Sequence, residues 1–91
     1  MRRIYEMSIA IPSDAVMAWA LAQAARSVAD DVWTRNEGQF IGTANGLRWV
    51  FTMTVYGDDG VQERVGKQLA EFAAGVWFNY VSVREVTDGA Q

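Results

Sequence analysis

The chain has 91 residues, of which 51% are hydrophobic, and it carries a net charge of −3. This length suits a single domain over residues 1–91, and the apolar content is sufficient for a folded core. The sequence contains no cysteine and no histidine. It therefore lacks disulfides, thiolate nucleophiles, and the commonest general base and metal ligand near neutral pH.

The eight basic residues are scattered along this acidic chain, and only Arg2 and Arg3 are adjacent. Proteins that bind nucleic acids cluster their cations to displace counterions from phosphates, so nucleic acid is disfavoured as a partner. No stretch has the unbroken apolar core of a signal peptide or the length of a membrane span. We therefore expect a cytoplasmic protein without a membrane contact.

Residues 3–11 alternate between apolar and polar side chains, which predicts a half-buried strand. Its apolar side carries Tyr5, Met7, Ile9 and Ile11. Pro12 ends the strand because it cannot donate a ladder hydrogen bond. On the polar side, Glu6 is expected to form an ordinary cross-strand ion pair with Arg84 of the last strand.

Helix-forming residues extend from Asp14 to about Val32, with Ser13 as a suitable N-cap. One apolar stripe of this helix carries Met17, Leu21, Ala24 and Val28. Trp19 lies roughly 200° around the helix from Met17. It is therefore a candidate exposed aromatic residue for partner binding. The interpretation that residue type favours is that the helix is rotated and Trp19 covers the rim of the core, because large aromatic side chains are usually at least partly buried.

Residues 33–38 are expected to connect this helix to a β-hairpin, with strand character at 32–34. The hairpin runs from Phe40 to Tyr56, because Asn45-Gly46 suits a type I′ turn. A two-residue turn there pairs Ala44 with Leu47, Gly42 with Trp49 and Phe40 with Phe51. In this register Gly42 leaves room for the Trp49 indole.

The predicted hairpin has two unequal faces. One carries the large apolar side chains and continues to Met53 and Val55, which predicts a buried face. The other is only mildly polar, as is typical of an open sheet face, which is either solvated or paired with another subunit. Together with Trp19, the candidate partner-binding residues are Ile41, Arg48, Val50, Thr52, Thr54 and Tyr56.

The last third of the chain predicts a turn, a helix and a strand. Residues 57–60 form the turn, and Asp59 with Gln62 has the spacing of a capping box. The amphipathic helix that follows has an apolar stripe of Val61, Val65, Leu69, Phe72 and Val76. A final strand is expected over residues 79–86, with Val81 and Val83 inward. Residues 87–91 are expected to form a flexible tail.

The resulting order, β-α-β-β-α-β, predicts a ferredoxin-like α+β fold. It consists of a four-stranded antiparallel sheet with two helices on one face and the first and third strands in the centre. Over residues 5–86 this order resembles ACT-like regulatory domains. The resemblance implies a small-ligand site in the loop between the first strand and the first helix, which here holds Pro12, Ser13 and Asp14.

No catalytic, metal-binding or cofactor motif stands out in the sequence. Asp30-Asp31 and Asp58-Asp59 lack the alternating oxygen ligands of a calcium loop. The acids of residues 57–60 would repel phosphate. We therefore predict no catalytic residue, no metal and no cofactor. The function that remains is a non-enzymatic protein-interaction module, acting as a homodimer, an adaptor or an inhibitor of a partner protein. The alternative is ACT-like binding of a small ligand.

Overall fold

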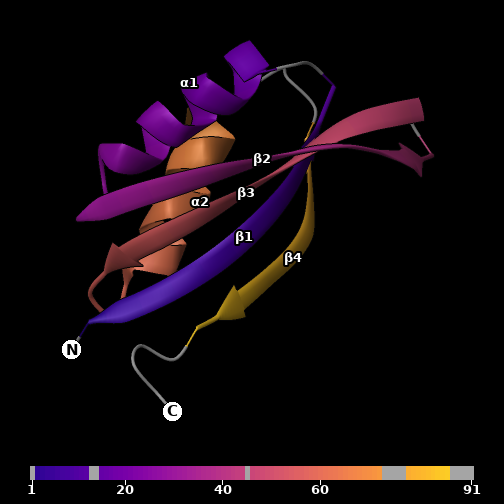
Figure 1. Ribbon diagram of the computed structural model, residues 1–91. Helices are drawn as coiled ribbons and strands as arrows, with labels where there is room; N and C mark the ends of the chain where they lie inside the picture. Colours follow the sequence, from indigo (N-terminus) through magenta and orange to yellow (C-terminus); the bar gives the residue numbers. More distant parts are fainter. Residues whose placement is uncertain (1, 13–14, 45, 73–77, 87–91) are drawn as a thin grey trace.

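A computed structural model describes residues 2–12, 15–44, 46–72 and 78–86 (Figure 1). The elements follow in the order β1 (Arg3–Ile11), α1 (Ala15–Arg26), β2 (Asp31–Thr43), β3 (Gly46–Gly57), α2 (Val61–Phe72) and β4 (Asn79–Glu85). The four strands form one antiparallel sheet in the order β2-β3-β1-β4, and both helices pack on one face of it. The predicted ferredoxin-like arrangement, with the first and third strands central, is confirmed.

The core lies between the helices and the two central strands. In the β1–β3 ladder Met7 pairs with Met53 and Ile9 with Phe51, and all four side chains are buried. Alternation in β1 and β3 directs these side chains toward the helices, because successive residues of a strand point to opposite faces. Helix α2 contributes Val61, Val65 and Leu69, which are fully buried members of the predicted stripe.

Helix α1 and strand β2 differ from the prediction. The helix ends at Arg26, well before Val32, and β2 begins at Asp31 and includes the whole expected connection. The Ser27 hydroxyl donates to the Ala24 carbonyl oxygen (2.6 Å) just past the helix end. Val32 pairs with Val55 and is buried. Burial and pairing in the sheet thus override the helix propensity of this segment.

The register of the hairpin also differs from the prediction. Thr43 pairs with Gly46, Gly42 with Leu47 and Phe40 with Trp49. For Gly42 and Phe40 the observed partner on β3 is two residues before the predicted one. Position 45 is outside the described residues. Gly46 adopts a φ of 100°, which favours glycine, and its carbonyl oxygen accepts a hydrogen bond from the Thr43 hydroxyl (2.8 Å). An even shift keeps every side chain on its predicted face.

Gly42 does not make room for an indole. It faces Leu47 rather than Trp49, and a Cβ built at Gly42 would meet no atom within 4 Å. The prediction depended on the assumed register, in which the two residues were opposite each other. The space beside Gly42 is open because the end of the hairpin lies beyond the core.

The turn before α2 is organised by Asp58 rather than by Asp59. The Asp58 carboxylate accepts hydrogen bonds from Gly60 N (3.0 Å) and Arg64 Nη1 (2.8 Å). The hydrogen bond from Arg64, followed by that from Gly60, lowers the pKa of Asp58. Asp59 instead accepts from Arg3 Nε on β1 (3.1 Å). The capping box predicted at Asp59 is therefore wrong, because the preceding aspartate occupies the turn.

Strand β4 is exposed along its whole length. Ser8 pairs with Ser82 but Ile9 pairs with Tyr80, so Val81 is an extra residue at a register shift and is half exposed. Val83 pairs with Met7 yet remains 36% exposed at this edge of the sheet. The inward orientation predicted for Val83 therefore agrees with its pairing, although the edge of the sheet leaves the side chain partly exposed. For Val81 the prediction is wrong, because the register shift takes this residue out of the ladder. The expected tail, residues 87–91, lies outside the described residues.

Candidate functional site

The sheet face opposite the helices is covered at its centre by a charged cluster. Glu6 of β1 accepts hydrogen bonds from Arg84 Nε (3.0 Å) and Nη2 (2.9 Å) of β4. Its other carboxylate oxygen lies 4.0 Å from Arg35 Nη2 of β2, which reaches across β3. The Ser8 and Thr52 hydroxyls share a hydrogen bond (2.9 Å) in the same region. The predicted Glu6–Arg84 pair is therefore present, as part of a larger network.

This cluster changes the assignment of partner contacts on the open sheet face. Val50 is 6% exposed and Thr52 only 3%, so neither side chain can act as a direct contact. The alternation of β3 shows correctly that they lie opposite the core. It does not reveal that neighbouring side chains cover them.

The remaining candidates on this face are only partly accessible. Their side chains are half-buried: Ile41, Arg48, Thr54 and Tyr56. The Arg2 guanidinium lies 5.0 Å from the centre of the Tyr56 ring, which shields that aromatic surface. Of the ligand loop implied by the ACT-like resemblance, Pro12 is exposed, and Ser13 and Asp14 lie outside the described residues.

Two highly exposed apolar side chains, Phe40 and Leu47, lie at the end of the β2–β3 hairpin. Strand β1 last pairs with β3 at Trp49, so residues 41–43 and 46–48 form a two-stranded ribbon that projects from the sheet (Figure 1). Phe40 is 60% and Leu47 69% exposed. Phe40 packs edge-on against Trp49, with ring centroids 4.8 Å apart. We call Phe40, Leu47 and Trp49 the hairpin patch.

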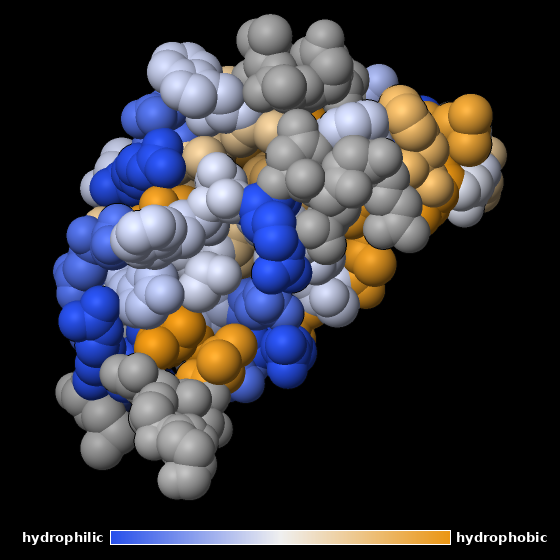
Figure 2. Space-filling model, in the orientation of Figure 1, coloured by the Kyte–Doolittle hydropathy of each residue, from blue (hydrophilic) through white to orange (hydrophobic). Residues whose placement is uncertain are grey.

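The hairpin patch lies on the face that was predicted to be buried. That prediction holds for Phe51, Met53 and Val55, which the helices cover. Beyond the helices the same face is open, and Figure 2 shows apolar side chains gathered at this end of the molecule. The Trp49 indole N–H is also buried there without a hydrogen-bond acceptor among the described residues. Sequence alternation alone cannot show where helix cover ends along a strand.

Trp19 and Trp33 are separate from the hairpin patch. Trp19 is 64% exposed on α1, so the favoured interpretation of a covered core rim is wrong, and Trp19 is the exposed aromatic residue that its angle around the helix indicates. Trp33 is 63% exposed near the start of β2, and its indole N–H donates to the Asp31 carboxylate (2.9 Å). Four further exposed apolar side chains lie at the end of α2 or along β4: Phe72, Tyr80, Val81 and Val83.

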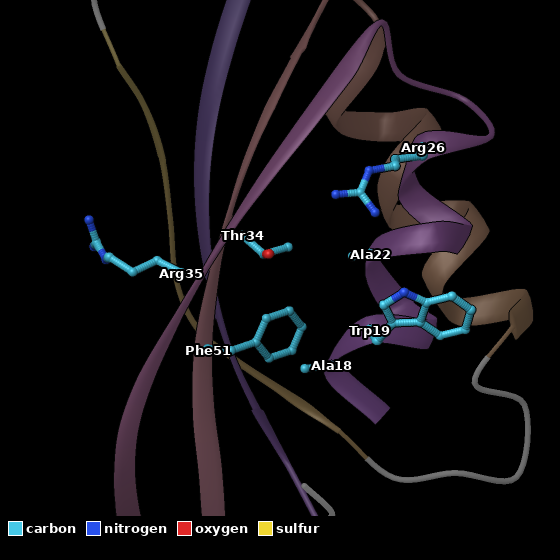
Figure 3. A pocket seen from close by; sticks show the side chains of 7 residues that line it. All are labelled: Ala18, Trp19, Ala22, Arg26, Thr34, Arg35 and Phe51. Carbon is cyan, nitrogen blue, oxygen red and sulfur yellow. The ribbon is translucent and has the colours of Figure 1, made fainter. Parts of the chain in front are cut away.

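A cavity of about 160 Å³ separates α1 from the edge of the sheet. Its helix wall is formed by Ala18, Trp19, Ala22 and Arg26, and its sheet wall by Thr34, Arg35 and Phe51 (Figure 3). Sequence reasoning identified Trp19 as exposed but missed this cavity. The sequence feature that could have indicated the cavity is the pair of small residues Ala18 and Ala22, one helical turn apart beside Trp19.

Solved structures with a similar fold include the following two. One is a divalent cation tolerance protein (CutA1) from Thermus thermophilus, with a TM-score of 0.61 and 10% identity, covering 100% of this chain and 87% of that one. The other is CPII, a nitrogen regulatory PII-like protein from Thiomonas intermedia bound to ADP, AMP and bicarbonate. It has a TM-score of 0.61 and 8% identity, and the match covers 99% of this chain and 91% of that one. The chain has the ferredoxin-like α+β fold.

No family model and no curated protein matches the sequence. The ACT-like resemblance is supported by the two solved structures, and only at the level of the fold. In the described segments no three residues with acidic, cysteine or histidine side chains gather as a metal site would require. Neither of the two described helices has the length and apolar character needed to cross a membrane.

Proposed function

We propose that this protein is a small non-enzymatic protein-interaction module that uses the hairpin patch as its contact surface. A second copy of the chain is the occupant that we propose for this surface. The observation that carries the proposal is the high exposure of Phe40 and Leu47 on a ribbon beyond the core. This moves the contact surface from the open sheet face, which is charged at its centre, to the end of the hairpin.

The energetics of the ribbon favour a covered state. An isolated two-stranded ribbon is marginally stable in water, and residues 41–43 and 46–48 have no third strand beside them in the described sheet. Aromatic side chains are enriched in interface cores, and Phe40 packed edge-on against Trp49 already presents such a surface. Fully burying a side chain of the size of Leu47 contributes about 1.5–3 kcal/mol.

The position of β2 supports a second copy as the occupant. In the described sheet β2 is an edge strand with β3 as its single neighbour. At the start of β2 the edge already has a hydrogen-bond partner, because Arg26 donates to the Val32 carbonyl oxygen (3.1 Å). Antiparallel pairing of the later part with the same strand of another copy is self-complementary, and it would bring two hairpin patches side by side.

The two solved neighbours are named as a cation tolerance protein and a nitrogen regulatory protein, which fits a regulatory role better than a catalytic one. A cytoplasmic location belongs to the same proposal. Ligand binding at Pro12, Ser13 and Asp14 remains the alternative, and no contact in the described residues adds to it.

Sedimentation velocity over a concentration series tests the proposal. We expect reversible dimer formation, with the dimer fraction rising with concentration. If the protein is a strict monomer, the second copy is excluded and the occupant of the hairpin patch must be a different protein. In that case the protein must bind a partner, and Leu47→Glu must abolish this binding. A strict monomer whose partner binding is unaffected by Leu47→Glu would contradict the proposal.

A further inference from the structure

The cavity beside α1 has an apolar floor and one cationic end. Figure 3 shows the Phe51 ring pointing from β3 toward Ala18, with Trp19 standing at the side of the cavity. Phe51 is 1% exposed and Ala22 is equally buried, so both belong to the packed core at the floor of the cavity. The exposed Trp19 and Arg26 mark the side on which the cavity opens to solvent.

Arg26 supplies the charge at this site. Its Nη2 donates to the Val32 carbonyl oxygen (3.1 Å), which holds the guanidinium against β2. Within the described part of the chain, Arg26 forms no ion pair with a carboxylate. Arg35, in contrast, extends to the opposite side of the sheet, toward Glu6 (Figure 3). Arg26 is therefore the cation that faces the cavity, and Thr34 adds a hydroxyl nearby.

The size of the cavity limits what can enter. Its volume is about 160 Å³, and an engineered apolar cavity of about 150 Å³ in another protein binds benzene. One six-membered ring or a branched alkyl group of similar size therefore fits. Protein interiors are normally packed without such voids. Here small side chains, Ala18 and Ala22, keep the space open where leucine would close it.

We propose that this cavity binds a small organic carboxylate that carries a single ring or a compact branched alkyl group. The apolar group lies against Phe51 and Trp19, and the carboxylate accepts hydrogen bonds from Arg26. Guanidinium–carboxylate pairs are among the strongest hydrogen-bonded contacts, which gives the site its selectivity for an anion. The site shares no residue with the hairpin patch, so a test of ligand binding here is independent of the proposed self-association.

Benzoate and its neutral isostere benzamide are suitable probes, with binding followed through backbone amide and Trp19 indole NMR signals. We expect saturable benzoate shifts at Ala18, Trp19, Ala22 and Phe51, with a dissociation constant of about 10 mM or tighter. Benzamide should bind more weakly. Arg26→Gln should weaken benzoate binding about tenfold or more, because hydrogen bonds to charged groups are the strong ones. The same variant should leave benzamide binding unchanged.

Lys67→Gln is the matched control, because it removes one positive charge from an exposed position on α2. It should leave benzoate binding as in the wild type. Ala22→Leu should close the cavity and abolish binding of both probes. If Ala22→Leu does not fold, Arg26→Gln decides alone. The proposal is overturned if benzoate causes no saturable shift at the cavity. Equal loss of benzoate affinity in Arg26→Gln and Lys67→Gln would also overturn it.

Discussion

Replacing Gly57 by alanine is expected to lower the free energy of unfolding by about 1–3 kcal/mol, the usual cost of overpacking a core. A Cβ at Gly57 would lie 2.6 Å from Cγ2 and 2.7 Å from Cβ of Val61. Val61 is fully buried at the start of α2. It cannot turn aside, because a β-branched side chain in a helix has one strongly preferred rotamer. Strand β3 and helix α2 would have to move apart.

Gly42→Ala is the matched control for this prediction. A methyl group at Gly42 meets no atom within 4 Å, and its backbone is not in the left-handed region. The substitution should be neutral or should stabilise the protein by about 0.4–1 kcal/mol, because alanine restricts the unfolded chain. Urea denaturation of the three proteins measures both effects. Equal destabilisation by the two substitutions would contradict the close contact between β3 and α2.

The double substitution Phe40→Ser with Leu47→Ser is expected to weaken association at least about 30-fold, as loss of a central interface anchor does. It should lower the free energy of unfolding of the monomer by no more than about 1.5 kcal/mol, because Leu47 is exposed and Phe40 loses mainly its edge-on contact with Trp49. Sedimentation velocity measures the first effect and urea denaturation of dilute protein the second. A module with a dedicated contact surface should show this separation of the two effects.

Trp33→Ser is the control for the double substitution. Trp33 is about as exposed as Phe40 and lies in the same strand, but it is at the other end of β2 and on the opposite face. Its loss removes a large exposed aromatic ring without touching the hairpin patch. Association should therefore be nearly unchanged in Trp33→Ser. A loss as large as that of the double variant would show that general surface hydrophobicity drives the association.

The parts of the fold that sequence reasoning predicted well are those in which one face is buried along a whole element. In β1 the alternation around Met7 and Ile9, and in α2 the spacing of Val65 and Leu69, identify elements and faces correctly. The order of elements then determines the sheet topology, because short connections and right-handed crossovers leave few alternatives.

The parts that it missed depend on contacts between distant residues. Val32 was predicted at the end of the helix but lies in β2, because there it pairs with Val55 and both side chains are buried. The hairpin register was ambiguous, because two registers that differ by two residues place the same side chains on the same face. Only the Thr43–Gly46 turn geometry distinguishes them.

The candidate site was predicted in part, for similar reasons. Exposure of Trp19 follows from its angle around the helix, which is local information. Burial of Val50 and Thr52 depends on residues of other strands, as the hydrogen bond between the Ser8 and Thr52 hydroxyls illustrates. The exposure of the hairpin patch depends on where the helices end over the sheet, and this packing has no signature in the alternation of β3.

The solvent accessibility of the Leu47 methyl groups in the associated protein tests the central claim most directly. Proton relaxation caused by a soluble paramagnetic probe reports it, with dilute monomer as the reference. In the associated state we predict that relaxation of the Leu47 methyls falls toward that of the buried Leu69 methyls, while the Trp33 ring keeps its monomer value. Unchanged relaxation at Leu47 in the associated protein would contradict the assignment of the hairpin patch as the contact surface.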